Sequence, residues 1–273
     1  MTRTARRVAT GRLTDQPPAA ISVRLAGGLA VSVNGSALKD AEISSRKGRS
    51  LLACLAVRRG YQSVDRLAAA VWGERPPRDP AANIATLISR LRGSLGASAI
   101  LGGRGGYRLD DEVRIDLDQA AGLVGEAERR ISAGQPAAAL MAAWRATHLL
   151  DRGLVLPEFP DADWAEPART QRTHLVRQAW HAAAEAALHM DDVSSAQSAA
   201  EAAMAADAFD EAACRLLMRA YQAAGQTSKA LQVYHRLRMT LAHELGVDPA
   251  PATRGLHVAI LRETTAVATP TAG

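Results

Sequence analysis

The chain changes at Ile21 from an aperiodic stretch to one in which apolar and polar residues alternate. Residues 21–33 read ISVRLAGGLAVSV, which is rich in β-branched residues and is interrupted by Gly27-Gly28. The Asn-Gly pair at 34–35 is typical of a tight hairpin turn. This pattern predicts a small antiparallel sheet.

Three segments with helical spacing follow the predicted sheet, starting with SSRKGRSLLACLAVRRG, which ends at Gly60, and a second helix over 63–73. The third runs from the PPRDP breaker to Gly96 and has five apolar residues at helical spacing, namely Ile84, Leu87, Ile88, Leu91 and Leu95. The following AILGGRGGYRLD predicts two short strands joined by a glycine-rich turn. A sheet, three helices and a hairpin in this order predict a winged helix-turn-helix, whose third helix enters the major groove and whose hairpin is the wing.

After Leu109 the pattern is helical and rich in alanine, and an internal repeat is visible. SAGQPAAALMAAW at 132–144 aligns with AAGQTSKALQVYH at 223–235, and a weaker copy lies at 189–203. Ala196 of the weaker copy precedes Ala230 by 34 residues. This period indicates tetratricopeptide-like helical hairpins.

These patterns predict a mostly α fold class with a small β component. A winged helix-turn-helix over 21–110 is followed by an all-α, tetratricopeptide-like domain over 111–263. Residues 1–20 are expected to form a disordered basic tail, and residues 264–273 a flexible one.

The charge is unevenly distributed between these two parts. The net charge of the 273 residues is +5, but residues 1–110 contain 18 Lys/Arg against 7 Asp/Glu, a balance of +11. Residues 111–273 contain 15 against 21, a balance of −6. The basic first part favours a polyanionic partner, and with the predicted fold that partner is double-stranded DNA.

The polar face of the third helix provides the candidate base-reading groups. Arg90 and Arg92 are expected to contribute most, since arginine pairs in a bidentate manner with guanine. Asn83 and Thr86 are expected to assist, because asparagine pairs with adenine and threonine contacts thymine methyl groups or phosphates. The alternative for this helix considered alone is an ordinary solvated face.

Two further basic elements support the DNA interpretation. In the wing, Arg104 lies between glycine pairs that allow the backbone to approach phosphates, and Arg108 follows. At the start of the first helix, three basic residues form a candidate contact with the phosphate backbone, although positive charge is unfavourable at a helix N-terminus: Arg46, Lys47 and Arg49. Trp72 is either a core residue or a phosphate contact through its indole N–H.

Other function classes find no support in the sequence. No nucleotide-binding, hydrolase or metalloprotease motif is present, so we expect no enzyme, no cofactor and no metal. Cys54 and Cys214 lie in apolar helical contexts and are expected to be buried free thiols. No signal peptide or membrane-spanning stretch is visible, which predicts a cytoplasmic, nucleoid-associated protein with no membrane partner.

The stretch SRKGRSLLACLAVRRGYQSVDRLAAAVWGERPPRDPAANIATLISRLRGSLG, followed by GGRGGYRL, resembles the DNA-binding part of the Streptomyces antibiotic regulatory protein (SARP) family, which uses an OmpR-type winged helix. Residues from about 116 to 263, with the specific ending HELGVDPAPATRGLHVAIL, resemble the bacterial transcriptional activation domain of that family. Gly93 departs from the family, which usually has a further basic residue there. The nucleotide-binding and longer repeat regions of larger members are not expected in this chain.

The resemblance implies an activator of a secondary-metabolite gene cluster, such as one for an antibiotic. It also implies binding to direct repeats near a promoter −35 element, with a second copy of the chain, and recruitment of RNA polymerase holoenzyme through its principal σ factor. The competing hypothesis is a helical-repeat scaffold whose winged domain binds protein instead of DNA. The +11 balance of residues 1–110 argues against that scaffold.

Overall fold

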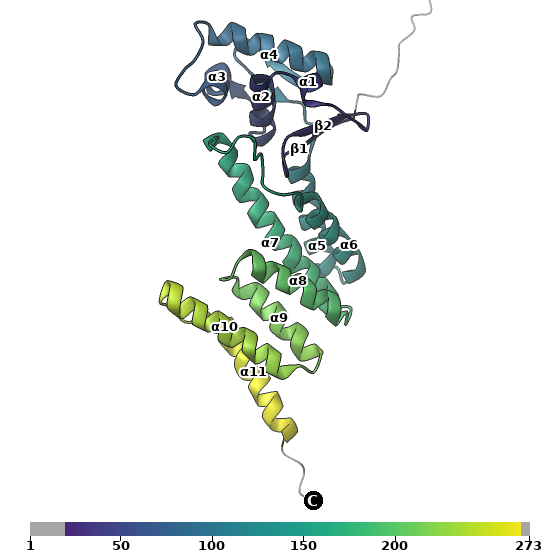
Figure 1. The fold of residues 1–273 in the computed structure, drawn as a ribbon. Helices are drawn as coiled ribbons and strands as arrows, with labels where there is room; N and C mark the ends of the chain where they lie inside the picture. The colour runs from purple at the N-terminus through teal and green to yellow at the C-terminus, as the bar shows by residue number, and fades with distance from the viewer. Residues whose placement is uncertain (1–19, 269–273) are drawn as a thin grey trace, which may run out of the picture.

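The structure is a computed structural model that describes residues 20–268. The tail expected over 1–20 lies outside the described residues except for Ala20. The predicted fold class is confirmed, because a small part with two sheets precedes a long helical part (Figure 1). The last helix, α11 (Pro251–Ala268), includes residues 264–268, where the sequence predicts a flexible tail, and residues 269–273 lie outside the described residues.

The first sheet contains the predicted antiparallel strands and one strand that the pattern does not predict. The three strands that follow one another in sequence are β1 (Ile21–Arg24), β2 (Ala30–Val33) and β3 (Ser36–Ala37). The turn between β2 and β3 places Asn34 and Gly35 at φ of 52° and 81°, which favours the Asn-Gly pair. At the opposite edge, β7 (Arg114–Ile115) pairs in parallel with β1.

The three predicted helices are present as α2 (Arg46–Val57), α3 (Val64–Trp72) and α4 (Pro80–Leu95). Each begins at a side-chain cap, in which Ser45, Ser63 and Asp79 accept the backbone N–H of Gly48, Arg66 and Ala82. The wing is the hairpin β5 (Ile100–Gly103) and β6 (Gly106–Leu109). Two short elements are additional, α1 (Asp40–Ile43) and β4 (Gln62–Ser63), which pairs with β6.

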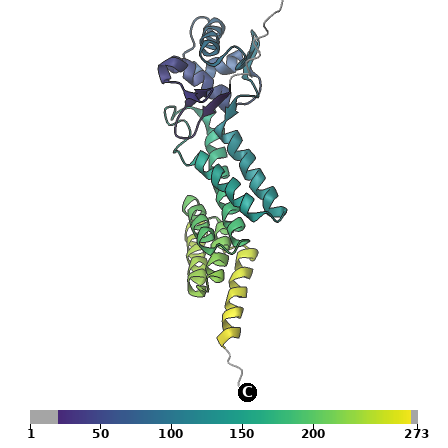
Figure 2. The same cartoon turned by 90° about the vertical axis from the view of Figure 1, so that its right-hand side faces the viewer.

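The helical part follows as a series of helices in which neighbours in sequence pack together. Its elements are α5 (Asp116–Ser132), α6 (Pro136–Leu150), the short 3₁₀ helix η1 (Asp163–Ala165), α7 (Glu166–Leu188), α8 (Val193–Ala206), α9 (Glu211–Ala223), α10 (Thr227–Leu245) and α11. Figure 2 shows this part extending away from the sheets as an elongated body, with α11 at its far end.

The repeated sequence forms the turn between the two helices of a hairpin. Gly134 lies between α5 and α6, Asp191 between α7 and α8, and Gly225 between α9 and α10, with φ of 68°, 55° and 69°. Asp191 therefore adopts the left-handed conformation that glycine provides in the other two copies. The aligned alanines of the next helix, Ala139, Ala196 and Ala230, are completely buried, which lets the paired helices approach closely.

The larger hydrophobic core extends across both parts of the chain. It joins residues of the first sheet and of α2 to α4 with Leu117, Val124, Leu150 and Leu175 of the helical part. At the junction, Ala26 forms a β-bridge with Val155, and a Cβ on Gly27 would lie 2.1 Å from the carbonyl oxygen of Arg152. The Gly27-Gly28 interruption thus allows the first sheet to contact the segment after α6 directly.

Candidate nucleic-acid interface

The helix α4 presents one buried and one exposed face. Its buried side chains are the five apolar residues that the sequence pattern identifies. The exposed face includes Asn83, Thr86, Ser89, Arg90 and Gly93. Figure 1 places α4 at the outer end of the molecule, on the side away from the helical part. The exposed face of α4 is therefore open to a large ligand.

Some polar side chains on this face already form hydrogen bonds within the protein, and others do not. Asn83 donates its side-chain N–H to the carbonyl of Asp79 at 2.7 Å, and Thr86 donates its hydroxyl to the carbonyl of Ala82 at 2.9 Å. The Arg90 side chain is exposed, and its guanidinium has no hydrogen bond or ion pair with any described residue. Arg90 is thus the group on α4 with its full donor capacity available.

Arg92 is half-buried, and the wing binds its guanidinium, which the sequence did not predict. Its Nε and Nη2 donate to the carbonyl of Ile100 at 2.9 and 2.8 Å, and Nη2 also donates to the carbonyl of Gly102 at 3.1 Å. Its Cζ lies 5.8 Å from the centre of the Tyr107 ring. Arg92 therefore connects the end of α4 to both strands of the wing.

The glycines of the wing have different roles. A Cβ on Gly102 would lie 2.3 Å from the carbonyl oxygen of Gly106, and a Cβ on Gly106 would lie 2.1 Å from the carbonyl oxygen of Gln62. These two glycines are required by strand packing, whereas a Cβ on Gly103 would contact nothing. Arg104 is exposed in the turn next to Gly103. The sequence predicts that glycines beside Arg104 let phosphates approach the backbone. This prediction fits the tip of the wing but not its base.

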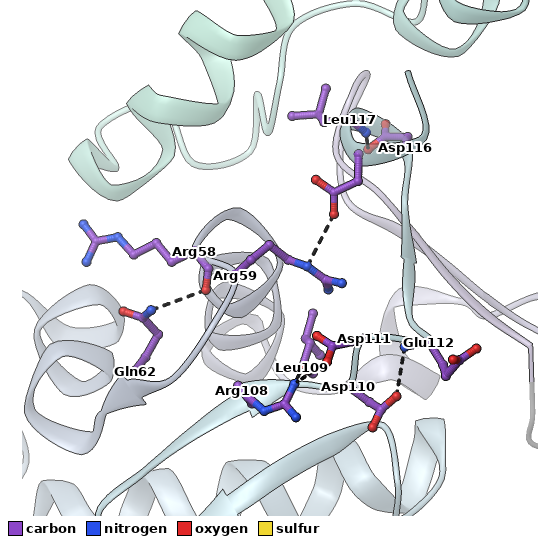
Figure 3. Close-up of polar contacts among 11 residues, drawn as sticks. Arg58, Arg59, Gln62, Arg108, Leu109, Asp110, Asp111, Glu112, Asp116 and Leu117 are labelled. Carbon is purple, nitrogen blue, oxygen red and sulfur yellow. Dashed lines mark hydrogen bonds and ion pairs between the residues drawn. The ribbon is translucent and has the colours of Figure 1, made fainter. Parts of the chain in front are cut away.

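Arg108 lies in β6, the second strand of the wing, and its guanidinium is already paired. Its guanidinium forms an ion pair with Asp111 at 3.0 Å (Figure 3). A second ion pair, at 3.3 Å, joins Arg59, in the segment after α2, to Asp118 of α5. Arg58 and Arg59 point to opposite sides of the chain in this view. The Arg59–Asp118 pair connects the winged part to the helical part.

The basic residues at the start of α2 lie next to the helical part. Lys47 Nζ lies 5.4 Å from the centre of the partly buried Trp72 ring. Arg49 donates to the carbonyls of Asp40 and Ser44 and pairs with the Asp40 carboxylate at 3.5 Å. Arg46 and Lys47 line a groove of about 650 Å³ whose other wall is the acidic segment 158–164. Arg46 and Lys47 therefore share this groove with the carboxylates of the segment 158–164.

Cys54 and Cys214 are buried and free, as predicted. Burial raises the pKa of the Cys54 thiol to about 11 and that of Cys214 to about 12, so both stay protonated and unreactive at neutral pH. His181 forms a 2.7 Å hydrogen bond with Asp210. Within residues 20–268, no group of three or more His, Cys, Asp or Glu has the arrangement of a metal site. No helix in this range combines the length and apolarity needed to cross a bilayer.

The family described as "Bacterial transcriptional activator domain" matches residues 115–261, more than half of the chain. The chain belongs to this family. It is 34% identical over 228 residues to the regulatory protein AfsR of Streptomyces griseus, a match covering 83% of this chain and 23% of AfsR. It is 27% identical over 263 residues to the regulatory protein DnrI of Streptomyces peucetius, covering 89% of this chain and 92% of DnrI. These relatives identify it as a SARP-family member.

A solved structure of EmbR from Mycobacterium tuberculosis, in complex with a low-affinity phosphopeptide, has the same fold. It superposes with a TM-score of 0.81 and 29% sequence identity over 90% of this chain and 66% of the EmbR chain. The chain spans less than a quarter of AfsR and about two thirds of EmbR.

Proposed function

We propose that this SARP-family chain binds promoter DNA in a sequence-specific manner and activates transcription, with α4 in the major groove. The observation that carries the proposal is the unpaired, exposed Arg90 guanidinium on α4, beside a wing with an exposed Arg104. The balance of +11 over residues 1–110 adds the electrostatic attraction that a duplex requires.

Arg90 is proposed to read guanine through two parallel hydrogen bonds. Thr86 lies about one turn and Asn83 about two turns before Arg90, and both are proposed to contact a neighbouring base edge or phosphate after releasing their bonds to the backbone. Arg92 is proposed to act by holding the wing, because its guanidinium donates to the carbonyls of Ile100 and Gly102. This division explains why the two arginines have such different surroundings.

The remaining basic residues are proposed to contact the phosphate backbone. Arg104 does so from the tip of the wing and Arg108 from its base, and Trp72 supplies an indole N–H to a phosphate. The start of α2 supplies three further cations, namely Arg46, Lys47 and Arg49. These contacts position the protein without selecting a sequence.

The family resemblance is the basis for proposing which genes are regulated, which DNA site is bound and how the polymerase is recruited. The proposals are control of a secondary-metabolite cluster, direct repeats near the −35 element occupied by a second copy, and recruitment of RNA polymerase holoenzyme through its principal σ factor. A cytoplasmic, nucleoid-associated location follows from binding DNA.

The test begins with sequencing the genomic fragments that the full chain retains, which yields both the motif and the neighbouring genes. On that motif, Arg90→Ala is expected to cost about 1–3 kcal/mol and to relax the preference at one base pair. Lys47→Ala, the control, is expected to weaken binding to all sequences alike. Unchanged base preference in Arg90→Ala would reassign Arg90 to the phosphate backbone.

The scaffold alternative predicts a different response to salt. A specific complex that neutralises several phosphates loses affinity steeply as salt rises from low to moderate concentration. A scaffold that uses its winged part for protein contacts shows no such slope with duplex DNA.

A further inference from the structure

The helix α6 has an apolar stripe on its outer face in addition to the face that it buries. Met141, Trp144, Arg145 and His148 occupy positions i, i+3, i+4 and i+7, which places them on one side of the helix. Met141 is 56% exposed and Trp144 is 42% exposed. The buried side is formed by other residues, mainly alanines, so the stripe has no packing role in the core.

This stripe forms one wall of a groove between α5 and α6. The groove has a volume of about 320 Å³, and Gln119 and Leu123 of α5 line its other wall. Exposed tryptophan and methionine beside an arginine is the composition enriched at the centres of protein interfaces. Its helical walls suit an amphipathic helix that inserts apolar side chains between them.

The charge around the groove indicates the sign of the partner. Arg145 and His148 line it, and no carboxylate does. The basic lining contrasts with the net charge of −6 over residues 111–273. A basic edge within an acidic region complements a partner helix with carboxylates beside its apolar residues.

The position of the groove is compatible with simultaneous binding of DNA. In Figure 1, α5 and α6 lie beyond the first sheet, and α4 lies at the opposite end of the N-terminal part. A protein seated between α5 and α6 therefore leaves α4 free.

We infer that the α5/α6 groove, lined by Leu123, Met141, Trp144 and Arg145, is the docking surface for an acidic amphipathic helix of RNA polymerase holoenzyme. This inference rests on the proposed function, since an activator has to contact the polymerase while it occupies its operator. It assigns that contact to a specific surface of the helical part.

The test measures binding of the full chain to purified RNA polymerase holoenzyme in the absence of DNA, and separately binding to the promoter fragment. Trp144→Ala and Arg145→Glu are each expected to weaken holoenzyme binding at least tenfold and to leave DNA affinity within twofold. The matched controls are Phe209→Ala, which removes another exposed aromatic side chain, and Arg219→Glu, which reverses another exposed charge. Both controls are expected to bind like the parent chain.

Several outcomes would overturn the inference. One is a parent chain that does not bind the holoenzyme, and another is a Trp144→Ala variant that binds like the parent. An Arg145→Glu variant that binds the holoenzyme as tightly as the parent would exclude an acidic partner. Variants that change self-association and leave holoenzyme binding unchanged would identify a second copy of the chain as the occupant. Met141→Ala, a smaller change, repeats the test if Trp144→Ala unfolds. A parent chain that fails to bind the promoter fragment would contradict the proposed function but not this inference, because holoenzyme binding is measured without DNA.

Discussion

Two arginines that lie two positions apart on α4 have opposite surroundings. Arg90 projects from α4 without a partner among the described residues, while Arg92 donates three hydrogen bonds to backbone carbonyls of β5. The distinction arises because residues two positions apart on a helix face different directions. An identical side chain is thus exposed and proposed to act in recognition at one position, and it connects two elements of the structure at the other.

Arg92→Ala is expected to lower the free energy of unfolding by about 2 kcal/mol, because charged hydrogen bonds of this kind contribute roughly 1.5–3 kcal/mol. Arg90→Ala, the matched control, is expected to change it by less than about 0.5 kcal/mol, as is usual for exposed positions. Urea denaturation of both variants measures the difference. Equal stabilities would mean that the Arg92 contacts do not hold the wing.

The residue patterns predict which face of α4 is buried and which side chains remain outside. They do not predict the partners of Arg92, because those partners are backbone carbonyls whose position depends on how the wing packs. For the same reason, the sequence gives no sign that Gly102 and Gly106 are required by neighbouring backbone. Contacts between distant backbone segments leave no periodic signal in a chain.

At the scale of elements, long helices and the main hairpins follow from periodicity and caps. The short elements α1, β4 and β7 do not, because segments of two to four residues have no measurable period. They exist because neighbouring elements supply their hydrogen-bond partners, as β1 does for β7 and β6 for β4. Such elements depend on tertiary structure and not on local sequence.

The glycine within α4 allows a prediction at this scale. A Cβ on Gly93 would meet no atom within 4 Å, and glycine inside a helix is less favourable than alanine by about 0.8–1.0 kcal/mol. Gly93→Ala is therefore expected to raise the free energy of unfolding by about 1 kcal/mol without changing DNA affinity, as measured by thermal unfolding and by binding assays.

Gly93→Arg restores the basic residue that is usual in the family. It is expected to strengthen binding to all DNA sequences and to increase the salt slope by about one, because it adds one phosphate contact. A changed base preference in Gly93→Arg would show that this position faces the bases.

At the scale of the whole molecule, the winged part and the helical part share one core. Asp116, at the start of α5, is buried and accepts backbone N–H bonds from Leu25 and Ala26 at 2.9 to 3.0 Å. Burial raises the pKa of the Asp116 carboxyl above its usual value, although these N–H groups and Arg24 act in the opposite direction. The sequence places a boundary near residue 110, but the composition of a chain does not reveal a core that crosses it.

A fragment of residues 1–110 is therefore expected to lack cooperative unfolding. It loses β7, Asp116 and the α5 side chains that belong to the same hydrophobic core as Val23 and Leu25. A fragment of residues 1–190, which contains the complete first core, serves as the control and is expected to unfold cooperatively in urea. Cooperative unfolding of the shorter fragment would show that the shared core is not needed for the winged part to fold.

The close approach of Gly27 to the backbone of Arg152 has a mechanical consequence. Because backbone packs directly on backbone at this junction, and Gly27 donates its N–H to the carbonyl of Leu154 at 2.9 Å, we expect the winged part and the adjoining helices to move as one unit. Under the proposed function, this connection fixes the rotational setting between the bound duplex and a protein bound to the helical part. Inserting half a helical turn of DNA between the operator and the promoter would then place that protein on the opposite side of the double helix.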